Sequence, residues 1–183
     1  DPQILMNLQP TLQTLLLPST PLTSMKRAQE LARFRDLSRI AFYTAHVSVL
    51  PLLPPQLTVL DVRYWERRNK DGSMAPVAPI HTLPRGLLRA VLGWGCFTTE
   101  WRELPPKLHT LMLYGKVEPE MAETLRNLPS TVTKLKLSLT QTPENFVKTL
   151  FSCLPPTLAY LELNLLVRDN LLHLLPKSVT SLS

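Results

Sequence analysis

The chain has 183 residues, 44% of them hydrophobic, with a formal net charge of +6 and a pI near 9.6. The apolar fraction excludes a disordered chain, and no apolar run approaches the roughly 18 residues of a membrane-spanning helix. The opening residues "DPQILMNLQP" contain neither an initiator methionine nor the charged head of a signal peptide, so we expect a piece of a longer chain.

Cysteine usage and charge indicate the environment of the protein. Only Cys96 and Cys153 are present, and no N-x-S/T glycosylation acceptor occurs, which favours an intracellular, reducing compartment. The basic charge suits acidic partners such as RNA, an anionic membrane surface or an acidic protein. The alternative is a basic surface that serves solubility alone, because the sequence contains no run of five like charges.

One phrase recurs along the whole chain. It reads "LPPQLTVLDV" from Leu53, "LPPKLHTLML" from Leu104 and "LPPTLAYLEL" from Leu154, and weaker copies lie between and around these. The spacing between copies is 20 to 30 residues, which predicts about eight units of one repeat. The first apolar positions of the units are Leu12, Leu37, Leu57, Leu87, Leu108, Val132, Leu158 and Val179.

Each unit contains a predicted strand that is buried on one face. In "TLAYLEL", Leu161 and Leu163 share one face, while Tyr160 and Glu162 share the other. One such strand cannot bury its own leucines. Parallel stacking of successive strands buries them together, and this requires a return segment in every unit.

Several return segments are predicted helices. In chain order they are 23–34, with Met25, Ala28, Leu31 and Phe34 on one face; 118–127, which begins with Glu118 and Pro119; 142–153, with Thr142 as N-cap and Pro143 in the first turn; and the shorter 168–175, capped by Asp169. The Leu-Pro-Pro phrase then ends the helix and leads, extended, into the next strand.

The L-x-x-L-x-L phrase at this period resembles the leucine-rich repeat family. The resemblance implies one domain over residues 1–183, an α/β right-handed solenoid with parallel strands on the concave side and helices on the convex side. One feature departs from the family pattern. The third residue after the last strand leucine, here called the ladder slot, is usually Asn or Cys; in this chain it is Thr20, Ala45, Trp65, Gly95, Lys116, Thr140 or Leu166.

The resemblance also implies that a partner protein binds the concave strands. The outward strand positions proposed for this contact are Arg39, Tyr43, Asp61, Arg63, Arg89, Met112, Tyr114, Lys134, Lys136, Tyr160 and Glu162. The same alternation places Ala41, Val59, Val91, Thr110, Ser138 and Asn164 outward. Because this face is basic and rich in tyrosine, we expect a partner protein with acidic residues. The alternative is that these side chains only keep an open sheet soluble.

A second hypothesis is contact with RNA, as a structural component of an RNA-protein assembly. Besides Lys134 and Lys136, the stretch "RYWERRNKDG" offers aromatic rings for stacking on bases and cations for phosphates. Its candidate residues are Tyr64, Trp65, Arg67, Arg68 and Lys70. The alternative is an ordinary solvated loop. In either case we expect this stretch to protrude, because its unit is the longest and "KDGSMAPVAP" reads as a flexible turn and linker.

Catalytic patterns are weak. The four histidines fall in different units without metal-ligand spacing, and no glycine-rich phosphate loop occurs, so we predict no enzyme, metal, cofactor or small-molecule site. Cys96 lacks a neighbouring base, and Cys153 reads as a buried apolar residue. The family resemblance also permits a substrate-adaptor domain of a ubiquitin ligase, whose ligase-docking module would lie outside these residues.

Overall fold

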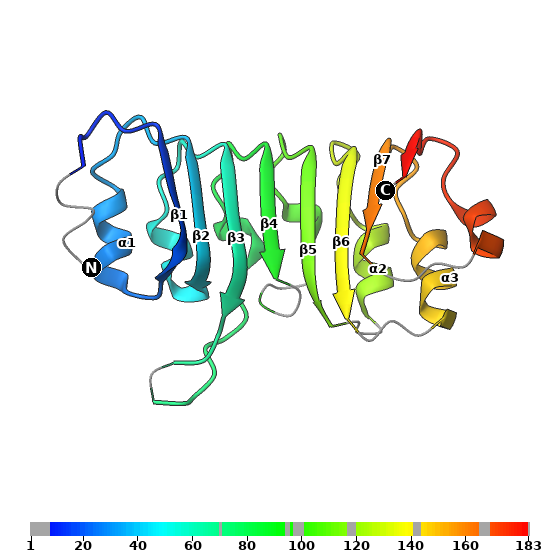
Figure 1. Cartoon of the computed structure of the whole chain (residues 1–183), viewed down its shortest axis with the longest axis horizontal. Coiled ribbons are helices and arrows are strands. Elements are labelled where there is room, and N and C mark those ends of the chain that lie inside the picture. The colour runs from blue at the N-terminus through cyan, green and yellow to red at the C-terminus, as the bar shows by residue number, and fades with distance from the viewer. Residues whose placement is uncertain are drawn as a thin grey trace.

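The computed structural model describes residues 8–69, 71–93, 96, 101–116, 120–140, 144–164 and 169–182. These residues form one open sheet of parallel strands, in which every strand pairs with the next strand along the chain (Figure 1). The strands are β1 (Thr14–Leu22), β2 (Arg39–His46), β3 (Val59–Glu66), β4 (Arg89–Gly93), β5 (Thr110–Lys116), β6 (Lys134–Thr140), β7 (Tyr160–Leu163) and β8 (Ser181–Leu182).

The phase of the predicted repeat is confirmed by the register of this sheet. Each strand begins two residues after the first apolar position of its unit, as Val59 follows Leu57 and Tyr160 follows Leu158. The first residues of neighbouring strands also pair with each other, for example Lys134 with Tyr160. Equivalent residues of successive units therefore lie side by side across the sheet.

The return segments are of two kinds. The three helices α1 (Met25–Leu31), α2 (Glu120–Arg126) and α3 (Glu144–Ser152) lie inside the predicted ranges. The predicted helix at 168–175 is instead a short 3-10 helix, η5 (Asp169–Leu174), which Asp169 begins rather than caps. Three further 3-10 helices complete the set: η2 (Val47–Leu52), η3 (Ile80–Thr82) and η4 (Trp101–Glu103). The expected first-turn residues Glu118, Pro119, Thr142 and Pro143 lie outside the described residues.

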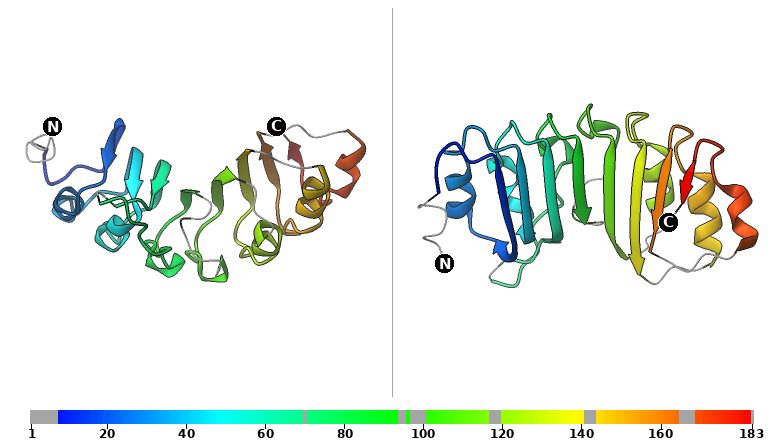
Figure 2. Two further views of the ribbon diagram at one scale, coloured as in Figure 1. Left: turned by 90° about the horizontal axis from the view of Figure 1, so that it is seen from below. Right: turned by 45° about the horizontal axis from the view of Figure 1, so that its top comes forward.

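The sheet is curved, and its helices and 3-10 helices lie along the outside of the curve, which leaves the inner face bare (Figure 2). The core lies between the sheet and these return segments. Strand leucines such as Leu60, Leu111 and Leu161 are fully buried there, together with Phe34 and Phe151 from the return segments. None of the described helices is both long and apolar enough to cross a membrane.

Two backbone hydrogen-bond patterns recur in every unit. In the first, a tight turn precedes each strand: Leu57 N donates to Pro54 O (3.2 Å), and Leu158 N to Pro155 O (3.1 Å). In the second, the carbonyl just before one strand accepts two N–H groups of the next unit, as Ser38 O accepts from Thr58 N (2.8 Å) and Val59 N (3.0 Å). The accepting carbonyls are those of Gln13, Ser38, Thr58, Leu88, His109, Thr133 and Ala159.

This second pattern, which we call the backbone ladder, holds neighbouring units together through main-chain atoms at the start of each strand. Because only main-chain atoms form these bonds, the residue whose carbonyl accepts can be of any type, and it ranges from Gln to Leu to His. Buried backbone groups must find partners, and the ladder supplies them at the start of every strand.

Candidate partner-binding surface

The bare face of the sheet carries three rows of side chains, which the register aligns across the strands. The first row is Thr14, Arg39, Val59, Arg89, Thr110, Lys134, Tyr160 and Ser181. The second is Leu16, Ala41, Asp61, Val91, Met112, Lys136 and Glu162. The third contains Gly93, Tyr114 and Ser138, which pair in register, together with Asn164, which bonds to Ser138, and Tyr43 and Arg63, which lie between the paired residues of β2 and β3. Every predicted partner-binding residue therefore lies in one of these rows.

At the N-terminal end of this face, two arginines and two tyrosines are open to solvent. Arg39 and Arg63 are exposed, and neither forms an ion pair with any residue that the structure describes. Tyr43 and Tyr64 are 44% and 51% exposed, and their rings meet edge to face with centroids 5.2 Å apart. We call these four residues the β2–β3 patch.

In the middle of the face, the Arg89 side chain contacts residues of both neighbouring strands. Arg89 Nη2 lies 3.8 Å from Asp61 Oδ2 and donates a hydrogen bond to Met112 Sδ (3.4 Å). Arg89 Nε is buried without a hydrogen-bond partner among the described residues. Val91, expected to face outward, is only 1% exposed. Its register neighbours are the larger Asp61 and Met112, and it lies outside the main core cluster.

At the C-terminal end, polar groups are tied together. Lys136 forms an ion pair with Glu162, and the Tyr160 hydroxyl donates to Glu162 Oε2 (3.3 Å). The hydrogen bond that Lys136 donates to the Glu162 carboxylate is the main cause that raises the pKa of Lys136. We call Lys136, Tyr160 and Glu162 the β6–β7 cluster. Beside it, Lys134 is exposed and has no ion-pair partner in the described part of the chain.

A shallow hollow lies over this end of the face. Its volume is about 340 Å³. It is lined by Arg89, Thr110, Met112, Lys134, Leu135, Lys136, Tyr160 and Glu162. Six of these eight residues belong to the predicted partner-binding set, so the structure brings the C-terminal half of that set together around one depression.

Trp65 is placed differently from the expectation that it could stack on a nucleic-acid base. It is 8% exposed, and its indole Nε1 donates to Val91 O on the next strand (3.0 Å). The residue before it, Tyr64, is exposed instead, so the strict alternation of β3 breaks after Arg63. Gly93 leaves room for the indole, because a Cβ at Gly93 would lie 3.3 Å from that of Trp65.

The position of Trp65 in its repeat could have indicated this burial, because it is the third residue after the last apolar residue of the strand, the position called the ladder slot above. Trp65 occupies the slot in its unit and satisfies a backbone carbonyl there, as the Asn of the family pattern does. Thr140, in the same slot three units later, also reaches a backbone group, since its Oγ1 donates to Gly115 O (3.4 Å).

The other residues predicted to contact nucleic acid also include both engaged and exposed side chains. Arg67 is used internally, because its Nε and Nη2 both donate to Ala75 O (3.0 and 2.9 Å). Arg68 is exposed, and Lys70 lies outside the described residues. Of the five residues proposed, Tyr64 and Arg68 therefore remain available at the surface.

The segment after β3 projects beyond the edge of the sheet, as expected for the longest unit, and the expected turn is part of a hairpin (Figure 1). Arg68 pairs with Met74 in an antiparallel bridge, and Asn69 N donates to Ser73 O (2.8 Å). Gly72 permits the turn with its φ of 83°. Asp71 Oδ1 accepts from the Ser73 hydroxyl (2.6 Å) and from Ser73 N (2.9 Å), and these bonds lower the pKa of Asp71.

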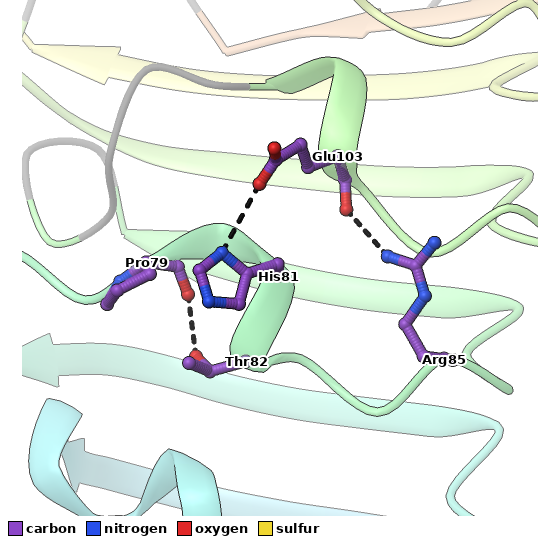
Figure 3. Close-up of polar contacts among 5 residues, drawn as sticks. All are labelled: Pro79, His81, Thr82, Arg85 and Glu103. Atoms are coloured by element: carbon purple, nitrogen blue, oxygen red, sulfur yellow. Dashed lines mark hydrogen bonds and ion pairs between the residues drawn. The ribbon is translucent and has the colours of Figure 1, made fainter.

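Three of the four histidines make local contacts in the structure. His46 caps η2, because its Nδ1 accepts from Ser48 N (3.2 Å); its Nε2 is buried without a hydrogen-bond partner among the described residues. On the return segments, His81 Nδ1 lies 3.2 Å from Glu103 Oε2, and Arg85 donates to Glu103 O (2.9 Å) (Figure 3). His109 contacts the Thr110 hydroxyl (3.0 Å).

Neither a metal cluster nor a reactive thiol is evident in the described part of the chain. No group of three His, Cys, Asp or Glu side chains is placed there to hold a metal ion. Cys96 and Cys153 are both buried and unpaired. Burial raises the pKa of the Cys96 thiol, which disfavours the nucleophilic thiolate.

Comparison with known proteins gives a distant likeness in structure. No family model matches the chain, and no curated protein matches it either. A leucine-rich repeat-containing protein of Legionella pneumophila, LegL7, is similar in structure at 15% identity and a TM-score of 0.41, over 88% of this chain and 68% of that protein. These values are too low to support an argument, so the repeat architecture rests on the strand register described above.

Proposed function

We propose that the chain is a right-handed leucine-rich repeat solenoid and that it binds a partner protein on the bare inner face of its sheet, without catalysing a reaction. The observation that supports this proposal is the presence of Tyr and Arg side chains on a face that none of the described return segments covers (Figure 2). Tyrosine and arginine dominate the energetics of protein interfaces because each combines a large apolar area with a polar tip.

The charge pattern favours a protein over an RNA partner. Lys136 is already paired with Glu162, and Trp65 and Arg67 are engaged within the fold. The surface that remains mixes isolated cations with tyrosines and methionine rather than forming a continuous basic track, which is what a phosphate backbone would require. A ubiquitin-ligase adaptor role stays a prediction from the family resemblance.

The test is affinity capture by the full-length protein from its native extract, divided into nuclease-treated and untreated halves. We expect partners that survive nuclease. Substitution of Tyr114 or Tyr160 by Ala should weaken capture by roughly 2 kcal/mol or more for an anchor residue. The matched control is Lys148→Ala, an exposed change on α3 at the opposite side of the sheet.

Two results would contradict the proposal. Loss of all partners after nuclease treatment would assign the surface to RNA instead. Capture that is equal for the Tyr114→Ala, Tyr160→Ala and Lys148→Ala variants, each still folded by circular dichroism, would show that the inner face does not bind.

A further inference from the structure

The β2–β3 patch differs from the rest of the inner face in how its charges are satisfied. Arg89 forms an ion pair with Asp61, and Lys136 forms one with Glu162. Arg39 and Arg63 have no ion-pair partner among the described residues and are exposed. The positive potential of this face is therefore least compensated at its N-terminal end.

The two tyrosines give the same patch an apolar component. Tyr43 and Tyr64 form an edge-to-face pair with 68° between the ring planes, and about half of each side chain is open. Tyr64 reaches this position because the alternation of β3 breaks after Arg63. Paired aromatic rings fix each other's orientation, so they present a preformed platform that costs little entropy on binding.

The register sets the distance between the two arginines. Arg39 lies in the first row on β2, and Arg63 lies on β3 in the third row, at the position between the pairs Phe42 with Val62 and Thr44 with Tyr64. Four residues along a strand and one strand spacing across it separate their backbones by about 14 Å. An extended peptide spans that distance in four residues, at about 3.3 Å per residue.

We propose that the β2–β3 patch binds an extended acidic segment of the partner protein, with two carboxylates about four residues apart on Arg39 and Arg63 and an apolar side chain on the Tyr43–Tyr64 pair. This inference rests on the proposed function and adds the chemistry of the partner to it. A guanidinium offers paired donors that match a carboxylate, so each arginine can bind one acidic side chain directly.

The test uses synthetic peptides and fluorescence anisotropy with the full-length protein. The probe is a fluorescein-labelled peptide of about 12 residues that carries two glutamates four positions apart, each beside a leucine, in a serine and glycine background. The control peptide has the same composition with its two glutamates adjacent. We expect the spaced peptide to bind at least about fivefold more tightly, because only it reaches both arginines.

Protein variants locate the contact. Arg39→Gln and Arg63→Gln should each weaken the spaced peptide about tenfold, as expected for the loss of one charge-assisted contact of about 1.4 kcal/mol. Lys134→Gln removes an exposed cation from the same row on β6 and should change the affinity less than about twofold. Equal losses of affinity in all three variants would indicate a general attraction between opposite charges. Equal binding of the two peptides would show that the spacing of the glutamates does not matter. Either result would overturn the proposal.

A third arm separates this inference from the proposed function. If an oligouridine of about 12 nucleotides binds more tightly than the peptide and loses affinity in Arg39→Gln, the patch binds nucleic acid and the proposal fails. In capture from extract, a partner retained by the Arg39→Gln/Arg63→Gln double variant but lost by Tyr160→Ala would refute the patch and keep the protein-binding function. A partner unaffected by any of these changes would refute both.

Discussion

The two ends of the inner face are built from the same repeat but expose different chemistry. On β2 and β3, Arg39 and Arg63 stand open beside two exposed tyrosines. On β6 and β7, Lys136 forms an ion pair with Glu162, and the Tyr160 hydroxyl donates a hydrogen bond to the same carboxylate. Each end carries two cations, but both arginines are unpaired on β2 and β3, whereas on β6 only Lys134 is unpaired among the described residues, because the register brings Lys136 beside Glu162.

The difference shows that a repeat fold separates stability from recognition. Inward leucines and the backbone ladder recur in every unit, so they carry the architecture. Outward residues differ from strand to strand, so a carboxylate such as that of Glu162 can pair with a cation at the same register position on the neighbouring strand.

The largest expected effect concerns the ladder-slot residues at the two ends. Trp65→Ala should lower the free energy of unfolding by about 3–5 kcal/mol, because it removes a buried indole and its hydrogen bond to Val91 O. Thr140→Ala should cost less than about 1 kcal/mol, because Thr140 is exposed and its hydrogen bond is long (3.4 Å). Urea denaturation of both variants measures this contrast, and similar midpoints would refute a structural role of the indole.

The next effect concerns binding rather than stability. Tyr64→Ala should weaken binding of the captured partner by about 2 kcal/mol while changing the unfolding free energy by less than about 0.5 kcal/mol, because Tyr64 is exposed and outside the core. Calorimetric titration with the purified partner measures the first quantity and urea denaturation the second. An unchanged affinity would place the anchors at the β6–β7 end instead.

A smaller effect is expected for the ion pair of the β6–β7 cluster. Glu162→Gln should destabilise the protein by about 0.2–1 kcal/mol at neutral pH, the range measured for exposed pairs. Because folding raises the pKa of Lys136 above its ordinary value of about 10.4, the contribution is complete below that pH and disappears as the pH rises through the folded value. Urea denaturation at pH 7 and above pH 11 tests this, and Arg39→Gln, which breaks no ion pair, is the control.

The smallest effect belongs to the hairpin beside the β2–β3 patch. Folding lowers the pKa of Asp71 through its bonds to Ser73, so the hairpin contacts should be complete above the ordinary carboxyl pKa of about 3.9 and weaken as the pH falls through the lower folded value. Hydrogen exchange at the Ser73 amide should speed up relative to intrinsic rates over that fall. In Asp71→Ala the pH dependence should vanish; a dependence that persists would assign it to another group.

Much of the fold could be predicted from the sequence because the repeat is redundant. Eight copies of one pattern placed the strand starts at Arg39, Val59 and their equivalents, and three helices followed from apolar spacing and turn residues. The 3-10 form of η5 could not be derived in this way, since a segment that short is decided by the space between neighbouring units rather than by propensity.

The surface was predictable in its positions but not in its pairings. Alternation placed Asp61, Lys136 and Glu162 outward, yet only the register between strands shows which charges meet. Trp65 was wrongly expected to be available for stacking, because alternation takes no account of the irregular end of the strand. Val91 faces outward as expected, but it is only 1% exposed between its larger neighbours Asp61 and Met112. After β3, the protruding turn was predicted, but its antiparallel bridge and the bonds between Asp71 and Ser73 were not, since they depend on specific side-chain contacts.

The backbone ladder also bears on how such a chain can change its length. Every rung joins only adjacent units and uses main-chain atoms, so a duplicated unit would find the same bonding partners on both sides without compensating substitutions. Each unit gained or lost would extend or shorten the inner face by about 4.8 Å, the spacing of neighbouring strands. Duplication and deletion within the gene can therefore adjust the reach of this surface in fixed steps while leaving the residues of the existing units intact.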